Sequence, residues 1–443
     1  MMLILLAIFA AVVAVLLLGL LPQRTAEIQQ VSQDTKRSET QQNYTGSLAC
    51  KECHEEVYNG WRSTLHPIKF QKANPSFVIG DFRNGKNIEA ANGTTIQMKR
   101  VGVQFQMDLQ PPNDTLQTFR VDYVLGSIWK QRYITQLATG ALAVLPVVWN
   151  VKQSRWETIL DEHAPGYPAL DNWQKPEYAF QYQCMGCHTT NAAFEVDNAT
   201  GKFTTQWTEM GVGCESCHGA GQAHLDAPIR EKAGTIINPA RLPDPRRAAM
   251  ICGSCHTRGS SPEGKHAYPV NYQTGDQLTF MFDENPGVQA DGNPKAHHQQ
   301  YNDWQASGHN LAGVACWDCH SPHLRGKSNR FQLKLPGSML CRSCHEVHPT
   351  GVHSLHSVNN CIGCHMPNTA KSVTAGDLRS HRFVVARPEK TLASKEDPPP
   401  PNSCNLCHYH SESDPEDLVH ALKAVTKPAR CTMCHDKDNE ELD

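Results

Sequence analysis

The chain is short of the residues that build a conventional hydrophobic core. Apolar residues make up only 39% of its 443 residues, and aromatic residues only 7%. These apolar side chains alone are few for the hydrophobic cores of the roughly three domains that this length suggests. Basic tracts are missing as well, and the formal charge of the polypeptide is −3. Nucleic-acid binding therefore gains no support.

No cysteine is left over for a disulfide, a catalytic thiol or a zinc site. The chain has 18 cysteines, and nine copies of the motif Cys-x-x-Cys-His use all of them. Zinc ribbons and fingers space their ligands differently, without a histidine directly after every second cysteine. The motif instead predicts covalently bound haem c, because its thiols form thioethers to the haem and its histidine binds the iron.

The predicted cofactors are nine covalently bound haem c groups, whose sites we number 1 to 9 in chain order. The haem-attaching cysteines are Cys50, Cys53, Cys184, Cys187, Cys214, Cys217, Cys252, Cys255, Cys316, Cys319, Cys341, Cys344, Cys361, Cys364, Cys404, Cys407, Cys431 and Cys434. The proximal iron ligands are His54, His188, His218, His256, His320, His345, His365, His408 and His435.

The second ligand of each iron is predicted to be a histidine outside the motifs. The chain has 23 histidines, nine of them in motifs, so 23 − 9 leaves 14. An iron with two histidine ligands has no open position and can only pass electrons, whereas an enzyme needs one open iron. The candidate distal ligands are His66, His224, His266, His298, His309, His323, His356, His381 and His420.

Some of these assignments stay open. His297 competes with His298, and His353 competes with His356. His224 and His323 lie too close to their own motifs to reach the opposite face of the same iron, so each is predicted to serve another site. His163, His348 and His410 are interpreted as surface or propionate-contacting residues.

A tryptophan followed five residues later by a histidine occurs twice, in Trp61–His66 and Trp304–His309. Each copy lies near a motif, which favours a haem-packing indole with a distal ligand. A helix-end tryptophan with an incidental histidine is the alternative.

The predicted fold class is a mostly irregular or α-helical multihaem cytochrome, organised around packed c-haems, with a β-rich domain inserted near the N-terminus. Nine haems would supply the apolar interior that the side chains lack. The insert is predicted where motifs are absent, because apolar and polar residues alternate from Val101 to Leu109, the period of a half-buried strand. Asn92-Gly93 predicts a hairpin, 111–114 a turn, and the apolar run 141–151 a strand buried on both faces. The insert is interpreted as a small sandwich or barrel.

The N-terminus carries an apolar run, Met2–Leu21, of about the length that spans a bilayer. No lysine or arginine precedes it and no clear cleavage site follows, so an uncleaved anchor is favoured over a cleaved signal. Because haem c is attached outside the cytoplasm, the body is predicted to be periplasmic or extracellular, membrane-anchored or secreted. The predicted segments are the anchor or signal segment (1–21), a flexible polar linker (22–46), the first haem segment (47–76), the β-rich haem-free domain (77–165), a multihaem domain with eight haems (166–435) and an acidic tail (436–443).

Several stretches resemble the multihaem c-type cytochromes with repeated Cys-x-x-Cys-His motifs, which are related to the tetrahaem cytochrome family of nitrifying bacteria and include tetratricopeptide-associated members. The stretches are SLACKECHEEVYNGWRSTLH, QYQCMGCHTTN, VGCESCHGAGQAH, GVACWDCHSPH, CIGCHMP with the later HRF, and PNSCNLCH; the haem-free VDYVLGSIWKQRYITQLATG also matches. The resemblance implies electron transfer through closely packed haems. Related architectures include pentahaem nitrite reductases and octahaem hydroxylamine oxidoreductases. The chain has no Cys-x-x-Cys-Lys motif, typical of the nitrite reductase catalytic haem, and no visible tetratricopeptide repeat.

The favoured function is an electron conduit in the periplasm or at the cell exterior, as a single molecule or a filament. The alternative is a multihaem oxidoreductase acting on a small nitrogen or sulfur compound at one open haem. The expected partners are redox proteins (a quinol-linked or soluble cytochrome donor, and a terminal acceptor or mineral), the membrane through the N-terminal segment, and further copies of the chain.

Overall fold

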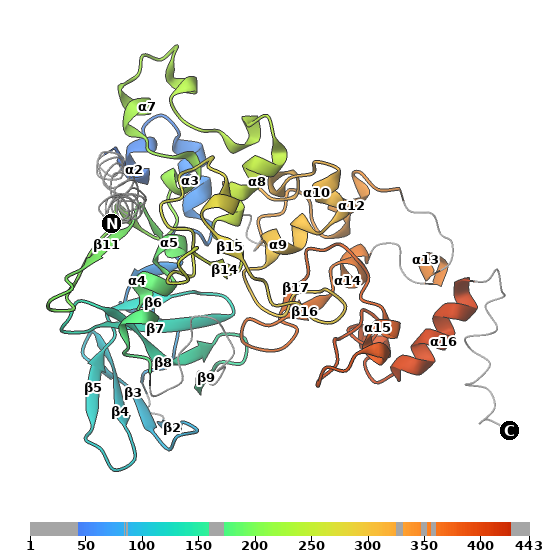
Figure 1. The fold of residues 1–443 in the computed structure, drawn as a ribbon, viewed down its shortest axis with the longest axis horizontal. Helices are drawn as coiled ribbons and strands as arrows, with labels where there is room; N and C mark the ends of the chain where they lie inside the picture. Colours follow the sequence, from blue (N-terminus) through green and yellow to red (C-terminus); the bar gives the residue numbers. More distant parts are fainter. Residues whose placement is uncertain are drawn as a thin grey trace, which may run out of the picture. The chain divides into compact units, whose positions relative to one another are not determined.

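The computed structural model describes residues 43–83, 85, 87–158, 172–324, 331–346, 352–355 and 360–426 (Figure 1). Within these residues no helix is long and apolar enough to cross a membrane. The predicted anchor or signal segment Met2–Leu21, site 9 (Cys431, Cys434 and His435) and the candidate ligand His356 lie outside the described residues.

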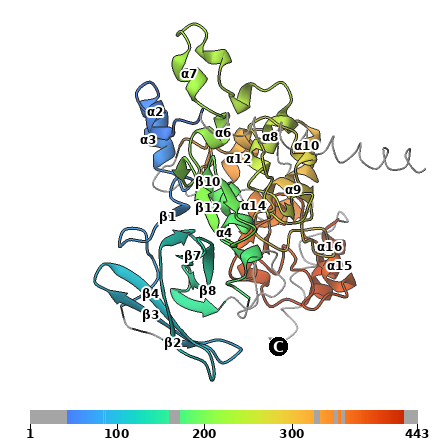
Figure 2. The ribbon, with the colours of Figure 1, turned by 60° about the vertical axis from the view of Figure 1, so that its left-hand side comes forward.

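Two antiparallel sheets form the β-rich part of the chain, and Figure 2 shows β2, β3 and β4 beside β7 and β8. One sheet has the order β2-β3-β4-β5, and the other has the order β1-β6-β7-β8-β9. The strands are β1 (Phe70–Lys72), β2 (Asn87–Glu89), β3 (Thr95–Val101), β4 (Gln104–Gln110), β5 (Gln117–Arg120), β6 (Tyr123–Leu125), β7 (Lys130–Gln136), β8 (Leu142–Asn150) and β9 (Arg155–Thr158).

The local sequence patterns explain these strands. Ile96 and Met98 of β3 and Met107 of β4 point into a core shared with Tyr133 and Leu145 of the other sheet. The two sheets therefore form a sandwich, as the alternation predicts. The predicted hairpin joins β2 to β3 through Gly93, whose φ of 80° suits glycine. The predicted doubly buried strand is confirmed as β8, where every residue but one is buried.

One strand of the sandwich comes from the segment that follows site 1. β1 pairs with β6, and the Phe70 ring is fully buried between Tyr123 and Phe180. The same cluster includes Met185, which lies inside the motif of site 2. The sandwich is therefore packed directly against a haem site.

Short helices and two-stranded sheets make up the rest of the described chain. Isolated helices below about 12–15 residues are marginal in water, so these depend on tertiary packing. The α-helices are α2 (Ser47–Cys50), α3 (Glu55–Arg62), α4 (Phe180–Gln183), α5 (Met185–His188), α6 (Glu215–His218), α7 (Gln222–Asp226), α8 (Pro245–Gly253), α9 (Gln300–Gln305), α10 (Gly308–Leu311), α11 (Cys316–Cys319), α12 (Ser338–Arg342), α13 (Val352–Leu355), α14 (Cys361–His365), α15 (Pro388–Ala393) and α16 (Pro415–Thr426). The 3₁₀ helices are η1 (Pro176–Tyr178), η2 (Lys232–Gly234), η3 (Pro239–Arg241), η4 (Leu278–Phe280) and η5 (His408–His410). The two-stranded sheets are β10 (Thr189–Thr190) with β13 (Glu209–Met210), β11 (Ala193–Val196) with β12 (Phe203–Gln206), β14 (Gly259–Ser260) with β15 (Asp283–Glu284), and β16 (Asn368–Ala370) with β17 (Leu378–Arg379).

The described residues belong to two compact units. Residues 43–45 and 219–236 form the smaller unit, which contains α7 and η2. Residues 46–218 and those from 237 onward form the larger unit, which holds the sandwich and sites 1 to 8.

The loop between β16 and β17 fastens the sandwich to the later haem sites. The indole of Trp129 donates to the carbonyl of Asp377 over 3.1 Å, and the ammonium of Lys130 donates to the carbonyl of Ser372. The Asp377 carboxylate in turn accepts from the backbone N–H groups of Ser372 (2.6 Å) and Val373 (2.9 Å). The loop is thus held rigidly just before β17, which leads to His381.

Candidate haem-binding sites

Several motif histidines lie close to a histidine from another part of the chain, with ring centroids 5.9–6.4 Å apart. An imidazole nitrogen lies about 2 Å from the metal it binds, so two rings on opposite faces of one iron have centroids about 6 Å apart. The spacing therefore fits one iron between each pair. The pairs are His188 with His298 (6.2 Å), His218 with His323 (5.9 Å), His320 with His381 (6.4 Å), His345 with His309 (5.9 Å) and His365 with His353 (6.3 Å).

Backbone carbonyls orient the motif histidines. Nδ1 of His218 lies 2.7 Å from the carbonyl oxygen of Ile237, and Nδ1 of His320 lies 2.8 Å from that of Phe331. A carbonyl only accepts, so each Nδ1 carries the proton and each Nε2 keeps its lone pair. This tautomer is the one that binds a metal through Nε2.

The two tryptophan–histidine elements have the same anchor. The Trp61 indole donates to the carbonyl of Val212 over 3.1 Å, and the Trp304 indole donates to that of Val314 over 2.8 Å. Each valine stands two residues before the first cysteine of a motif, at site 3 and at site 5 respectively. The tryptophan therefore holds its histidine-bearing segment against a later attachment motif, site 3 for Trp61 and site 5 for Trp304.

Site 3 provides a first test of the paired histidines. A Cβ atom added at Gly60, in α3, would lie 2.0 Å from the carbonyl oxygen of His323. Gly60→Ala is therefore expected to displace His323 from His218 and to convert one haem from low spin to high spin. Electron paramagnetic resonance of the oxidised protein measures the change. Gly308→Ala is the matched control, because its Cβ meets nothing within 4 Å although it adjoins His309. Equal spectra for the two variants would contradict the assignment.

Sites 2 and 4 share a cluster of buried histidines. The His298 ring is 6.2 Å from His188 and 6.3 Å from His256, so it lies beside both motif histidines. His66 is close enough to His256 for their charges to interact: burial, followed by His256, Lys69 and His323, lowers the pKa of His66 to about 4. All these imidazoles are therefore neutral at pH 7, the form that binds iron.

Cationic side chains surround the His188–His298 pair. Burial, together with Lys69, His256 and Arg132, lowers the pKa of His188 to about 3. Burial and then Arg258 are the leading causes that lower the pKa of His298, with Lys130 among the others. Cations are thus concentrated at site 2, and the sequence motifs gave no signal for them.

The structure gives His297 and His298, the two alternative candidate ligands, different surroundings. Arg258 donates through Nε to the carbonyl of His297 over 2.7 Å, and its Nη2 lies 3.0 Å from Nδ1 of the same residue. His297 is therefore engaged by Arg258, whereas His298 lies beside the motif histidines.

Cysteines of different motifs lie against one another, which relates the sites in space. Hydrogen bonds join the thiols of Cys50 and Cys214, Cys187 and Cys255, Cys252 and Cys316, and Cys341 and Cys361. Charge interactions link Cys217 with Cys255, Cys319 with Cys341, and Cys364 with Cys407. Sites 1 to 8 are therefore connected through their attachment points.

The other predicted ligands lie elsewhere. Nδ1 of His266 is 2.9 Å from Glu263, and its ring packs against Tyr182. His224, in the smaller unit, has Nδ1 2.9 Å from the carbonyl of Lys232. His54 and His420 are exposed, on α3's N-terminal side and on α16. His353, the alternative to His356, is the histidine that lies beside His365.

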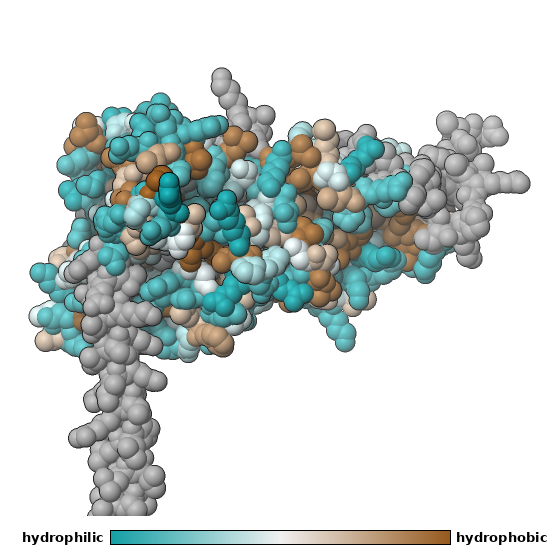
Figure 3. Space-filling model, turned by 90° about the horizontal axis from the view of Figure 1, so that it is seen from above, coloured by the Kyte–Doolittle hydropathy of each residue, from teal (hydrophilic) through white to brown (hydrophobic). Residues whose placement is uncertain are grey.

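Large apolar side chains are exposed next to the motifs, and Figure 3 shows such hydrophobic residues among hydrophilic ones on one face. Leu48 (71% exposed) adjoins site 1, Leu311 (78%) precedes site 5, and Met339 (61%) precedes site 6. Haem faces would cover apolar groups of this kind. The residues around the motifs therefore fit the predicted cofactor.

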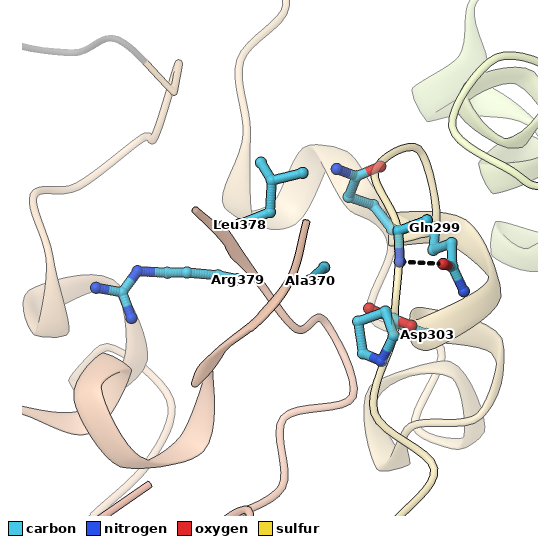
Figure 4. Close-up of a pocket in the computed structure, with 8 residues that line it drawn as sticks. Gln299, Asp303, Ala370, Leu378 and Arg379 are labelled. Carbon is cyan, nitrogen blue, oxygen red and sulfur yellow. Dashed lines mark hydrogen bonds between the residues drawn. The ribbon is translucent and has the colours of Figure 1, made fainter. Parts of the chain in front are cut away.

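A small pocket lies between α9 and the β16–β17 hairpin (Figure 4). Gln299 closes one side by accepting from the backbone N–H of Ala296 over 2.8 Å. Asp303, which is buried, accepts from the backbone N–H of His381 over 2.9 Å, and burial raises its pKa to about 7. Asp303 therefore positions the histidine that faces His320.

Known proteins share parts of this arrangement. The family model described as cytochrome c554 and c-prime matches residues 49–99 and 149–219, and the model described as a doubled CXXCH motif matches residues 309–350. The outer cell wall cytochrome OcwA superposes with a TM-score of 0.61 over 86% of each chain, at 21% identity, which shows a common fold.

Two curated relatives match shorter segments. The cytochrome c nitrite reductase subunit NrfA of Nitratidesulfovibrio vulgaris is 24% identical over 170 residues, which cover 30% of this chain and 32% of the relative. The dissimilatory sulfite reductase MccA of Wolinella succinogenes is 28% identical over 181 residues, 35% of this chain and 22% of the relative. The chain thus spans less than a third of either relative's length. The attachment motifs, the matching families and the shared fold together identify the chain as a multihaem c-type cytochrome.

Proposed function

We propose that this cytochrome carries electrons along nine haem c groups, most of them held between two histidines, in the periplasm or at the cell exterior. The observation that carries the proposal is the series of neighbouring cysteines, by hydrogen bonding or by electrostatic influence, that relates the motifs of sites 1 to 8 to one another. Each haem, when bound, supplies a one-electron ferric/ferrous couple. When haem is bound, each pair of histidines would hold the iron from both sides, which would leave electron transfer as the chemistry of those sites.

The cysteine contacts support one order of the sites. Cys50 with Cys214 joins site 1 to site 3, and Cys217 with Cys255 joins site 3 to site 4. The line continues through sites 5, 6, 7 and 8 in chain order. Site 2 meets this line at site 4, where Cys187 contacts Cys255. The proposed path is thus 1-3-4-5-6-7-8 with site 2 as a branch.

The proposed partners are a redox protein that donates electrons and an acceptor protein or mineral that receives them. Among the described residues, exposed motif cysteines occur at sites 1 and 8, the two ends of the path, and also at site 6: Cys53, Cys407 and Cys344. The N-terminal apolar run would export or anchor the chain. The likeness to OcwA, an outer cell wall cytochrome, supports a location outside the cytoplasm.

Two measurements test the conduit. Mass spectrometry is expected to show nine covalently bound haems, since every cysteine belongs to a motif. Electron paramagnetic resonance is expected to show predominantly low-spin iron, with little carbon monoxide binding after reduction. High-spin iron at several sites, or fewer haems than motifs, would argue against this function.

A second candidate function is the reduction of a small oxyanion at site 2, which has an open iron position if His298 serves His256 of site 4 and not His188. The observation that favours it is the group of cations, Lys69, Lys130, Arg132 and Arg258, around a site at the end of a branch. Cationic side chains attract and orient anions in a buried site. The names of two relatives, a nitrite reductase and a sulfite reductase, support the same class of substrate.

The test of this candidate is anion binding. Nitrite or sulfite is expected to alter the optical spectrum of one haem, and Arg258→Gln is expected to weaken that binding. Arg83→Gln, an exposed arginine in the sandwich paired with Asp81, is the control. A spectrum unchanged by either anion would leave electron transfer as the function of all sites.

A further inference from the structure

Two glutamates enter the junction between sites 1 and 3. The Ser47 hydroxyl donates to Oε2 of Glu209 over 2.7 Å, and the backbone N–H of Gly46 donates to Oε2 of Glu215 over 2.8 Å. The same serine oxygen accepts from the backbone N–H of Cys214 over 2.9 Å. The Glu209 carboxylate is therefore linked to the attachment point of site 3 by two hydrogen bonds, through the Ser47 hydroxyl.

The junction is closely packed and dry. Ser47 and Glu215 are each 1% exposed. A Cβ atom at Gly213 would lie 2.2 Å from Oε2 of Glu209 and 2.8 Å from the Ser47 hydroxyl, so only glycine fits there. The backbone N–H of Gly213 is satisfied by Thr190 over 2.7 Å. The chain thus builds a specific place for the two carboxylates.

Both carboxylates act electrostatically on the cysteines of the two sites. The Cys214 thiol, burial, and then the charges of Glu215 and Glu209 raise the pKa of Cys50. The hydrogen bond with Cys50 is the main cause that lowers the pKa of the Cys214 thiol to about 7, and the charge of Glu209 opposes this lowering. Because charge interactions strengthen away from water, a fixed negative charge here has a larger effect than one at the surface.

We propose that Glu209 and Glu215 lower the reduction potentials of the haems at sites 1 and 3. The physical reason is that ferric haem carries one more positive charge than ferrous haem. A nearby carboxylate stabilises the ferric form, so one-electron reduction becomes harder, without the making or breaking of any bond. The proposal rests on the proposed electron path, in which sites 1 and 3 form one end. A low-potential end is the one at which an electron donor would deliver its electron.

A redox titration of the haem-loaded protein with dithionite, followed by haem absorbance, tests the proposal. Glu209→Gln and Glu215→Gln keep an oxygen that accepts the observed hydrogen bond but remove the charge. Each is expected to shift the midpoint potentials of two haems upward and to leave the other haems unchanged. Since Glu215 is buried and Glu209 is half-buried, the shift is expected to persist in high salt, most fully for Glu215→Gln.

Two controls make the result decisive. Glu56→Gln removes an exposed carboxylate of α3, beside site 1, and is expected to have a smaller effect that salt abolishes. Glu209→Asp keeps the charge and is expected to restore the potentials toward those of the natural protein. Shifts no larger than that of Glu56→Gln would overturn the proposal. The haem count and the spin state test the conduit separately, so the two ideas fail independently.

Discussion

Removal of the haem at site 5 is expected to abolish electron transfer between the two ends of the proposed path. Within the described residues, the neighbouring cysteines that connect sites 1 to 4 with sites 6 to 8 are those of site 5. Cys316 touches Cys252 of site 4, and Cys319 lies beside Cys341 of site 6. Cys316→Ala with Cys319→Ala prevents attachment and leaves a gap in the middle of the line.

The experiment needs contacts at both ends of the molecule. Asn59→Cys, on exposed α3, and Glu412→Cys, in the exposed segment before α16, provide thiols for gold electrodes near sites 1 and 8. Single-molecule conductance is then measured, with mass spectrometry to verify the number of haems.

The matched control removes a haem from the branch. Cys184→Ala with Cys187→Ala eliminates site 2, which adjoins the line at site 4 through the neighbouring Cys187 and Cys255. Conductance is expected to persist in the variant that lacks the haem of site 2 and to be lost in the variant that lacks the haem of site 5. His381→Met is a gentler second variant, because it keeps the haem attached and alters the ligand that faces His320. Equal conductance in the site 2 and site 5 variants would refute the proposed order.

The parts of this structure that the sequence predicts are those that depend on neighbouring residues. A motif of five residues specifies a haem attachment by itself. Likewise, the alternation from Phe105 to Leu109 specifies β4, and Asn92-Gly93 specifies the hairpin between β2 and β3. Their signals are local, so no knowledge of the tertiary fold is needed to see them. The predicted alternation is wrong for Val101 and Val103, which lie exposed at the turn between β3 and β4.

The histidine partners depend instead on the path of the whole chain. His323 follows the site 5 motif in sequence, yet it lies beside His218 of site 3. The sequence predicts only that it serves another site, because nothing local names that site. Similarly, His353 and His356 are equivalent in sequence, and only the packing of α13 places His353 beside His365. Arg258 belongs to no sequence motif, so only the structure reveals that it lies near site 2.

Substitution of Phe70 by alanine is expected to cause a large loss of stability. Phe70 is fully buried, and its ring centroid lies 4.4 Å from Phe180, 5.0 Å from Tyr123 and 5.6 Å from Trp207. Removal of a buried phenylalanine side chain costs about 3–5 kcal/mol, since the lost contacts leave a cavity. Phe70→Ala is therefore expected to lower the midpoint of guanidinium unfolding, measured by circular dichroism.

Phe70→Ala is also expected to affect site 2, because Phe70 packs against residues of that motif. Its cluster contains Met185, Cys184 and Cys187, so the cavity opens against site 2. A loosened site 2 is expected to hold its histidine pair less firmly, which would appear as high-spin iron before global unfolding. Phe70→Leu, which fills part of the cavity, is expected to show both effects in weaker form. Phe280→Ala is the control, because that ring is 81% exposed and its loss is expected to cost at most about 0.5 kcal/mol. If Phe70→Ala unfolded at the same denaturant concentration as Phe280→Ala, the sandwich would not be the support of site 2 that its packing indicates.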